Sequence, residues 1–160
     1  MRGFCFVYLL VILTVNCTYG CKTGWMQFQN KCYYFSVLAR EWGVASSYCK
    51  AFKSKLAEPQ TEAEAHFLSS HAQKFGGKSF WIGITDMVEE TTWTYASNQQ
   101  PIHIASFWGV HEPNGHAVEN CAMLWSGSHD KMADYTCAGG LNFICEQDQE
   151  FSEVQNEVIG

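Results

Sequence analysis

Four oxygen-bearing side chains in the second half of the chain have the types and spacing that a divalent cation needs. Glu112 and Asn114 flank Pro113, Glu119 lies shortly before one cysteine, and Asp134 lies shortly before the next. Calcium is a hard cation that takes six to eight oxygen ligands, so carboxylates and amide carbonyls suit it. The pattern therefore indicates a calcium-assisted binding site in a loop closed by cysteines.

No catalytic constellation accompanies these acids. Serines are plentiful, but the sequence contains neither a GxSxG motif nor a legible pairing of a nucleophile with a base. The six cysteines after residue 20 are expected to form disulfides, which leaves no thiol as a nucleophile. We therefore expect a binding protein and not an enzyme.

Helices and strands must position the four oxygen donors, and the residue pattern predicts where these helices and strands lie along the chain. The first half should contain a hairpin, a helix with apolar residues at helical spacing, and a second helix that opens on a capping box of Thr61 and Glu64. The second half should contain a central strand, a long loop region and two closing strands. The expected ranges, in order, are 24–36, 41–52, 61–76, 80–84, 86–120, 121–125 and 141–145. A segment as long and irregular as residues 86–120 is usually functional in a compact domain.

The first twenty residues have the layout of a secretory signal peptide. Arg2 precedes an apolar run over residues 4–15, and Thr18 and Gly20 are small residues suited to a cleavage site. The run is shorter than the roughly 20 residues that span a bilayer, so we expect no membrane insertion. We expect a signal peptide at residues 1–20, one domain at residues 21–147, an acidic tail at residues 148–160, and secretion to the extracellular space.

The net charge of the chain limits the kinds of molecule that it is expected to bind. The formal net charge is −6, from 16 acidic and 10 basic residues. A chain this acidic, with no basic cluster, is a poor candidate for binding nucleic acid or anionic membranes. Some of the acids can instead hold a divalent cation, although most are expected only to keep a secreted protein soluble.

Cysteine usage indicates a disulfide framework. Eight cysteines become six when the signal peptide is removed, an even number for an oxidising compartment. Three disulfides are expected, although spacing alone permits fifteen connectivities. A zinc site is the alternative, but the sequence contains no CxxC pair.

An ordered set of cysteines, tryptophans and short motifs resembles the C-type lectin domain, and short single-domain lectins secreted by invertebrates are similar in layout. The set comprises Cys21, Gly24-Trp25, Cys32-Tyr33, Trp42, Cys49, Trp81-Ile82-Gly83, Trp93, Trp108, Glu112-Pro113-Asn114, Cys121, Cys137 and Phe143-Ile144-Cys145-Glu146. The resemblance implies an α+β fold with two helices, mixed and antiparallel sheets and a long loop region. It also implies the disulfide pairs Cys21–Cys32, Cys49–Cys145 and Cys121–Cys137.

The same resemblance implies roles for the oxygen donors. Glu112, Asn114, Glu119 and Asp134 would bind calcium, and the first three would also bind carbohydrate. In the family, the order Glu-Pro-Asn goes with equatorial 3- and 4-hydroxyls, as in mannose and GlcNAc. The Glu112–Pro113 bond is a candidate cis peptide, because a cis bond aims both flanking side chains at one point.

One ligand position departs from the family pattern. Members with an intact site usually have Trp-Asn-Asp where this chain has Met132-Ala133-Asp134. Ala133 can give neither an amide oxygen to calcium nor an NH2 donor to a sugar. We expect weakened but retained calcium binding, with water or Asp130 as a substitute ligand.

A second, auxiliary calcium site occurs in some relatives. Asp86 and Glu90 match two of its positions, Asn120 stands where an acid is common, and Gly115 replaces another acid. The auxiliary set is therefore half present, and the alternative is that Asp86 and Glu90 are solvated turn residues.

Two classes of function remain. The leading hypothesis is a secreted lectin that recognises mannose- or GlcNAc-type glycans in pattern recognition and innate immunity. Non-covalent oligomers or clustered glycans would raise its avidity. The alternative is a lectin-like structural module that binds proteins, mineral or ice, or a sugar binder that needs no calcium. Ala133 favours the alternative, whereas the intact Glu112-Pro113-Asn114 favours the lectin.

Overall fold

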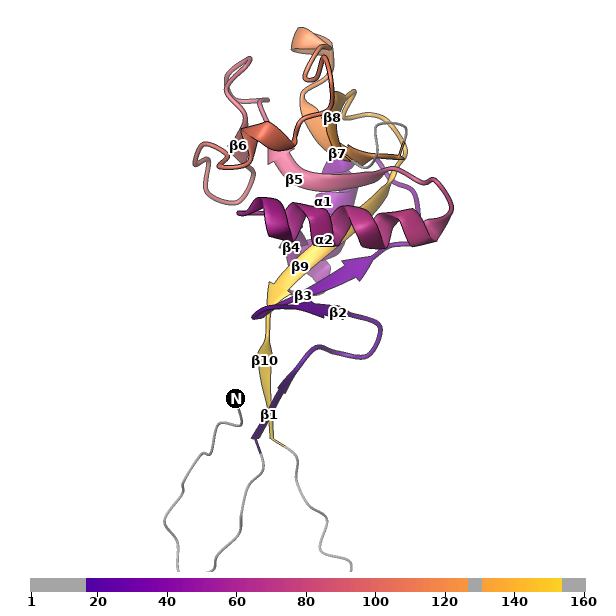
Figure 1. The fold of residues 1–160 in the computed structure, drawn as a ribbon, viewed down its shortest axis with the longest axis vertical. Coiled ribbons are helices and arrows are strands. Elements are labelled where there is room, and N and C mark those ends of the chain that lie inside the picture. The colour runs from indigo at the N-terminus through magenta and orange to yellow at the C-terminus, as the bar shows by residue number, and fades with distance from the viewer. Residues whose placement is uncertain (1–16, 127–130, 154–160) are drawn as a thin grey trace, which may run out of the picture.

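The computed structural model describes residues 17–126 and 131–153, most of them in strands and two helices of a mixed α+β fold (Figure 1). The strands are β1 (Cys17–Gly20), β2 (Met26–Phe28), β3 (Lys31–Phe35), β4 (Lys55–Leu56), β5 (Phe80–Thr85), β6 (Thr94–Tyr95), β7 (Cys121–Trp125), β8 (Lys131–Tyr135), β9 (Asn142–Asp148) and β10 (Glu150–Glu153). The α-helices are α1 (Trp42–Ala51) and α2 (Glu62–Ala72), and the 3-10 helices are η1 (Gln73–Phe75), η2 (Ala105–Phe107) and η3 (His116–Val118).

Strand β9 lies inside the main sheet and joins the two halves of the chain. The sheet has eight strands in the order β2-β3-β9-β5-β7-β8, with β4 paired to β9 and β6 paired to β5. Strands β5 and β9 run parallel, with Phe80 opposite Asn142, and the other strand pairs named in this sheet are antiparallel. The mixed sheet is the one that the resemblance implies.

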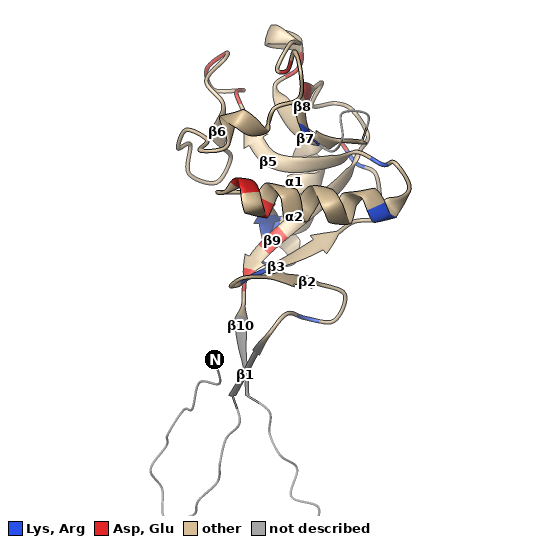
Figure 2. Cartoon of the chain, in the orientation of Figure 1, with Lys and Arg blue, Asp and Glu red and all other residues tan. Residues whose placement is uncertain are grey.

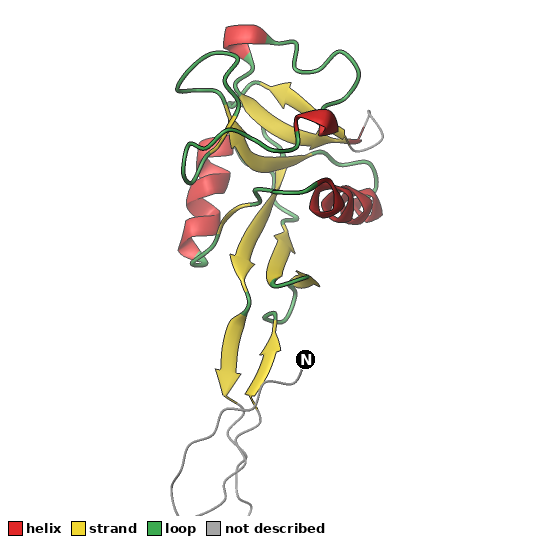
Figure 3. Cartoon of the chain, turned by 60° about the vertical axis from the view of Figure 1, so that its left-hand side comes forward, coloured by secondary structure: helices red, strands yellow, loops and turns green. Residues whose placement is uncertain are grey.

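The two helices cover opposite faces of this sheet (Figure 3). Helix α1 contributes Trp42 and Ala45 to one buried apolar cluster, which surrounds Trp81. Helix α2 contributes Ala65 and Leu68 to a second and larger cluster. Each helix is therefore held by one apolar stripe, as its residue spacing predicts.

The start of α2 differs in part from the predicted capping box. The Thr61 hydroxyl accepts a hydrogen bond from the backbone N–H of Glu64 at 3.2 Å, as expected for an N-cap. The Glu64 carboxylate does not return to the N–H of Thr61. Its Oε2 instead accepts from the N–H of Gln60 at 2.8 Å, and its Oε1 accepts from Lys31 and Tyr33. The cap is half of the predicted box because Glu64 is drawn into contacts with β3.

Three disulfides cross-link the described part of the chain. They join Cys21 to Cys32, Cys49 to Cys145 and Cys121 to Cys137, which are the pairs that the resemblance implies. The second connects α1 to β9 across 96 residues, and in the chain-entropy model such a loop stabilises the fold by about 4–5 kcal/mol.

Both domain boundaries predicted from the sequence fall at a two-stranded sheet formed by β1 and β10. Residues 1–16 of the expected signal peptide lie outside the described residues, but residues 17–20 form β1 and pair antiparallel with β10. The expected acidic tail from residue 148 therefore includes the end of β9 and all of β10. Cleavage after Gly20 would remove β1 and leave β10 without this partner. Within the described residues, no helix is long and apolar enough to cross a membrane.

A buried network of charges links α2 to the sheet and to the segment after β4. Glu58, Glu64 and Glu146 are at most 5% exposed. Lys31 contacts both Glu64, at 2.8 Å, and Glu146, at 3.4 Å, and Lys55 contacts Glu58 and Glu146. Burial outweighs the attraction of the two lysines and raises the pKa of Glu146 from 4.5 to about 7. The network therefore couples the folding of the domain to pH.

The stability of the Glu146→Gln variant, relative to that of the wild type, should increase as pH rises. Because the folded state binds the Glu146 proton more tightly than the unfolded state, the stability that this proton confers is lost between pH 4.5 and 7. The glutamine side chain does not titrate, so the free energy of unfolding of this variant relative to wild type should rise by about 3 kcal/mol across that window. Urea titrations at pH 4 and pH 8 measure this difference, and a constant difference would contradict the raised pKa.

Candidate functional site

The long loop region lies at the end of the molecule opposite β1 and β10, and Asp and Glu gather in it (Figure 2). It leaves the sheet at the end of β5 and returns at Cys121, the first residue of β7. Cys121 pairs with Tyr135 of β8, and its disulfide to Cys137 closes the same end of that strand pair. This closure brings the end of the long loop beside Asp134.

Asp134 attaches the loop to β8. Its carboxylate is 4% exposed and accepts hydrogen bonds from the backbone N–H groups of Asn114, at 3.0 and 3.1 Å, and Gly115, at 2.7 Å. A carboxylate that accepts backbone N–H bonds makes strong, charge-assisted contacts. Asp134 therefore determines where the backbone on the C-terminal side of Pro113 lies.

Glu112 and Asn114 lie side by side across Pro113. The Asn114 Nδ2 donates a hydrogen bond to Glu112 Oε1 at 3.0 Å, and the Glu112–Pro113 peptide is cis, as expected from the sequence. The second carboxylate oxygen, Glu112 Oε2, is buried and has no hydrogen-bond partner. A buried oxygen without a partner is costly, so this atom marks a position where a donor or a cation would fit.

The acids of the loop repel one another. Burial, followed by the neighbouring Asp134 carboxylate and the charge of Glu119, raises the pKa of Glu112 to about 7. Burial and the charge of Asp134 also raise the pKa of Glu119. None of the salt bridges found in the described residues joins these three acids to a basic side chain. The site therefore carries negative charge that a divalent cation would compensate.

The donor set has the right chemistry for calcium but is not gathered into a cage. The described residues contain no group of three or more His, Cys, Asp or Glu side chains arranged to hold a metal ion. Glu112, Asn114 and Asp134 are in direct contact, whereas the Glu119 side chain is folded over Gly115. Glu119 would have to turn away from Gly115 to join a common coordination shell.

Ala133 has a structural role in β8. It is 2% exposed and belongs to the apolar cluster around Trp81, with Met123 opposite it on β7. Successive side chains of a strand alternate between its faces, so Ala133 and Asp134 point in opposite directions. No oxygen comes from position 133, and the substitute proposed from the sequence, Asp130, lies outside the described residues.

Two of the three predicted auxiliary residues share a small cavity. Asp86 and Glu90 line it together with Asp134, His116 and Pro113, and its volume is ≈ 120 Å³. Asp86 is 3% exposed, its Oδ2 accepts from the N–H of Thr91 at 2.9 Å, and its Oδ1 has no partner. Burial and the nearby charge of Asp134 raise the pKa of Asp86.

The third auxiliary residue, Asn120, does not line this cavity. Its backbone carbonyl accepts hydrogen bonds from the N–H of Asp86, at 3.3 Å, and the hydroxyl of Thr85, at 2.6 Å. Asn120 therefore holds the end of β5 in place. Sequence reasoning did not place His116 in the cavity, because the loop folds back over Asp86 and no local pattern signals such a contact.

Comparisons with known proteins agree with this architecture. The family model described as "Lectin C-type domain" matches residues 39–147. The human C-type lectin domain family 4 member E is 33% identical over 134 residues, which are 82% of this chain and 59% of that protein. The perlucin-like protein of Mytilus galloprovincialis is 24% identical over 148 residues, 88% of this chain and 92% of that protein. The chain thus spans less than two thirds of the human relative.

Solved structures share the fold. The carbohydrate-recognition domain of the mouse scavenger receptor C-type lectin superposes with a TM-score of 0.74 at 29% identity, covering 82% of this chain and 100% of that one. The cow CD23 domain in the presence of GlcNAc2Man3 oligosaccharide gives 0.72 at 30% identity, with coverages of 82% and 98%. A calcium-independent type II antifreeze protein gives 0.73 at 19% identity, with coverages of 83% and 98%, a likeness of fold alone.

Gly115→Ala should destabilise the loop because a Cβ atom there would overlap with Oε2 and Cβ of Glu119. Overpacking of this kind costs about 1–3 kcal/mol. Gly140→Ala is the matched control, since its Cβ would meet nothing within 4 Å. Urea unfolding in EDTA measures both, and equal stability of the two variants would contradict the packing of Glu119 on Gly115.

Proposed function

The chain belongs to the C-type lectin domain family, and on that premise we propose that it is a glycan-binding protein that recognises mannose- or GlcNAc-type glycans with the help of calcium. Members of this family are non-enzymatic carbohydrate binders, in agreement with the missing catalytic pattern. Glu112, Asn114, Glu119 and Asp134 are the proposed calcium ligands, and the first three are the proposed contacts to sugar.

The observation that carries the proposal is the pair of Glu112 and Asn114 beside Asp134. The amide of Asn114 and the carboxylate of Glu112 already face one another at 3.0 Å, and the other Glu112 oxygen is buried without a partner. Glu112, Glu119 and Asp134 also repel one another, which raises the pKa of Glu112 and of Glu119, and a cation would relieve this repulsion. Both features suit an oxygen-coordinated divalent cation.

The chain's own groups would orient the sugar. Glu112 can only accept a hydrogen bond when ionised, whereas the Asn114 amide nitrogen can only donate one. A pair of vicinal hydroxyls would satisfy both, one donating to Glu112 and the other accepting from Asn114, in place of the present contact between the two side chains. When bound, calcium would add direct coordination of these hydroxyls and offset most of the charge of the three acids. Asp134 would keep the loop in position through its bonds to Asn114 and Gly115.

The biological setting belongs to the same proposal. We propose a signal peptide at residues 1–20, a domain at residues 21–147, an acidic tail at residues 148–160, and secretion for pattern recognition in innate immunity. The six cysteines of the domain pair within the chain, so any oligomer would be non-covalent. Oligomers or clustered glycans would compensate for the weakness of single sites.

The buried Ala133 supports a second candidate. Its methyl group packs in the core and gives no ligand, and Glu119 is turned towards Gly115. A domain in this state would bind sugar without calcium, or would act as a structural module for proteins or mineral. One fold can carry several functions, so the fold alone does not decide between the candidates.

A glycan array in calcium and in EDTA distinguishes them. We expect binding to mannose- or GlcNAc-type glycans in calcium, with at least a tenfold loss in EDTA, because calcium would coordinate the hydroxyls and neutralise the acids. Binding that is the same in EDTA would support the calcium-independent sugar binder. The absence of any glycan signal in both buffers would contradict the lectin and favour the structural module.

The double substitution Glu112→Gln with Asn114→Asp tests the contacts themselves. It exchanges the acceptor and the donor, so mannose binding should fall at least tenfold, or preference should shift towards galactose. Glu41→Gln with Asn30→Asp makes the same chemical changes at exposed positions outside the site and should leave binding unchanged. If the first pair of changes also left mannose binding intact, the sugar would lie elsewhere.

A further inference from the structure

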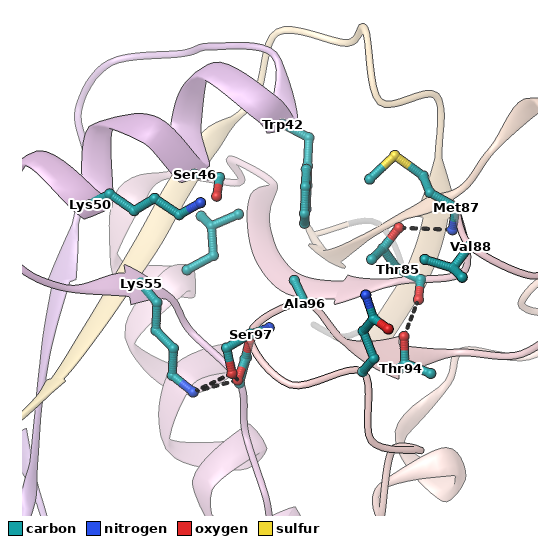
Figure 4. A pocket seen from close by; sticks show the side chains of 13 residues that line it. Trp42, Ser46, Lys50, Lys55, Thr85, Met87, Val88, Thr94, Ala96 and Ser97 are labelled. Atoms are coloured by element: carbon teal, nitrogen blue, oxygen red, sulfur yellow. Dashed lines mark hydrogen bonds and ion pairs between the residues drawn. The ribbon is translucent and has the colours of Figure 1, made fainter.

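A larger cavity lies on the α1 side of the sheet (Figure 4), and neither Glu112 nor Asn114 lines it. Its volume is ≈ 430 Å³, and its walls come from α1, β4 and the segments that follow β5 and β6. Pockets for small ligands typically measure roughly 300–1,000 Å³ and are mostly apolar, with a few convergent polar groups. The cavity therefore has the size of a small-molecule site.

One face of α1 lines this cavity with an aromatic ring, a hydroxyl group and an ammonium group. Trp42, Ser46 and Lys50 are four residues apart, so their side chains lie along one side of the helix. The stripe is about 12 Å long, at a rise of about 1.5 Å per residue. Figure 4 shows the indole, the hydroxyl and the ammonium in this order, with the Lys50 ammonium extended towards Ser46. The cavity thus has an apolar end and a hydrogen-bond-donating end.

The two donors on this stripe are free to bind a ligand. Within the described part of the chain, neither the Ser46 hydroxyl nor the Lys50 ammonium has a hydrogen-bond or ion-pair partner. They lie one helical turn apart, so both can reach the same small anionic group. A carboxylate accepts charge-assisted hydrogen bonds from such donors.

The acidic side chain in the cavity lining, Glu58, already has ion-pair and hydrogen-bond partners. Glu58 is 1% exposed, pairs with Lys55, and accepts hydrogen bonds from the Ser97 N–H at 2.8 Å and the Ser97 hydroxyl at 2.6 Å. Two lysines and this one glutamate are the charged residues of the lining. The cavity therefore favours an anion even though the whole chain has a net charge of −6.

The opposite end of the cavity has exposed apolar side chains. Met87 is 51% exposed and Val88 is 74% exposed, and both belong to the lining, across from Trp42. An apolar ligand that covers them would gain about 25 cal/mol for each Å² removed from water. A straight alkyl chain that begins at Lys50 would reach Met87 and Val88 after running along Trp42.

We propose that this cavity binds a medium-chain fatty acid or a closely similar amphiphilic anion. The carboxylate accepts hydrogen bonds from Ser46 and Lys50, and the alkyl chain lies along Trp42 towards Met87 and Val88. The site contains none of the proposed calcium or sugar ligands. It is therefore independent of the lectin proposal, and failure of one does not decide the other.

Calorimetric titration of the full chain with sodium decanoate, below its micelle concentration, tests the site. We expect saturable binding of decanoate and at least tenfold weaker binding of decanol and decylammonium, because only the carboxylate pairs with Lys50. Lys50→Met should weaken decanoate binding at least tenfold. Lys53→Met removes the same charge from a lysine outside this cavity and should change the affinity less than twofold.

A second pair of variants tests the apolar end. Val88→Asp places a charge where the alkyl chain lies, and it should weaken decanoate at least tenfold. Val37→Asp makes the same change at a side chain that is 67% exposed and outside the lining, and it should have no effect. The proposal is wrong if wild type fails to bind decanoate, if decanol binds equally well, or if either variant behaves like its control. Both valines are exposed, so folding should survive these changes.

Discussion

The pairing of β9 with both halves of the chain is the constraint on which the rest of the structure depends. This strand bonds to β3 along one edge and to β4 and β5 along the other, and Cys145 within it is linked to Cys49 of α1. Glu146, the next residue, joins the buried charge network. With β9 in place, each helix has a sheet face to cover, and β5, β7 and β8 form a rigid base for the long loops.

Asp134 plays the corresponding role for the candidate site. It lies on β8, whose register is set by β7 and by the disulfide beside it, and it holds two backbone amides of the loop. The position of Glu112 and Asn114 thus follows from a contact between a strand of the sheet and the long loop. The same arrangement brings acidic side chains together without a basic partner. Their mutual repulsion destabilises the loop, and the same negative charge favours the binding of a cation.

The end of β5 separates the two proposed sites. Thr85 and Met87 line the cavity beside α1, whereas Asp86, between them, lines the small acidic cavity with Asp134. Alternation at the strand end puts Thr85 and Asp86 on opposite sides, and the turn that follows β5 brings Met87 and Val88 back to the α1 side. Thr85 also donates a hydrogen bond to the carbonyl of Asn120, one residue after Glu119. A ligand on one side of this segment would therefore contact the same backbone that supports the other site.

The spacing of apolar and capping residues was enough to predict the helices and the central strand, and the resemblance to the C-type lectin domain supplied the disulfide pairs. The oxygen donors at Glu112, Asn114, Glu119 and Asp134 stay a prediction. Other features depend on how distant segments pack. The Glu64 side chain contacts β3 instead of completing the capping box. Ala133 lies in the core, and His116 and Asp86 line the same cavity. Ser46 and Lys50 line a cavity only because the segments after β5 and β6 pack opposite α1. These outcomes depend on segments far apart in the chain, and local spacing carries no information about which distant groups will meet.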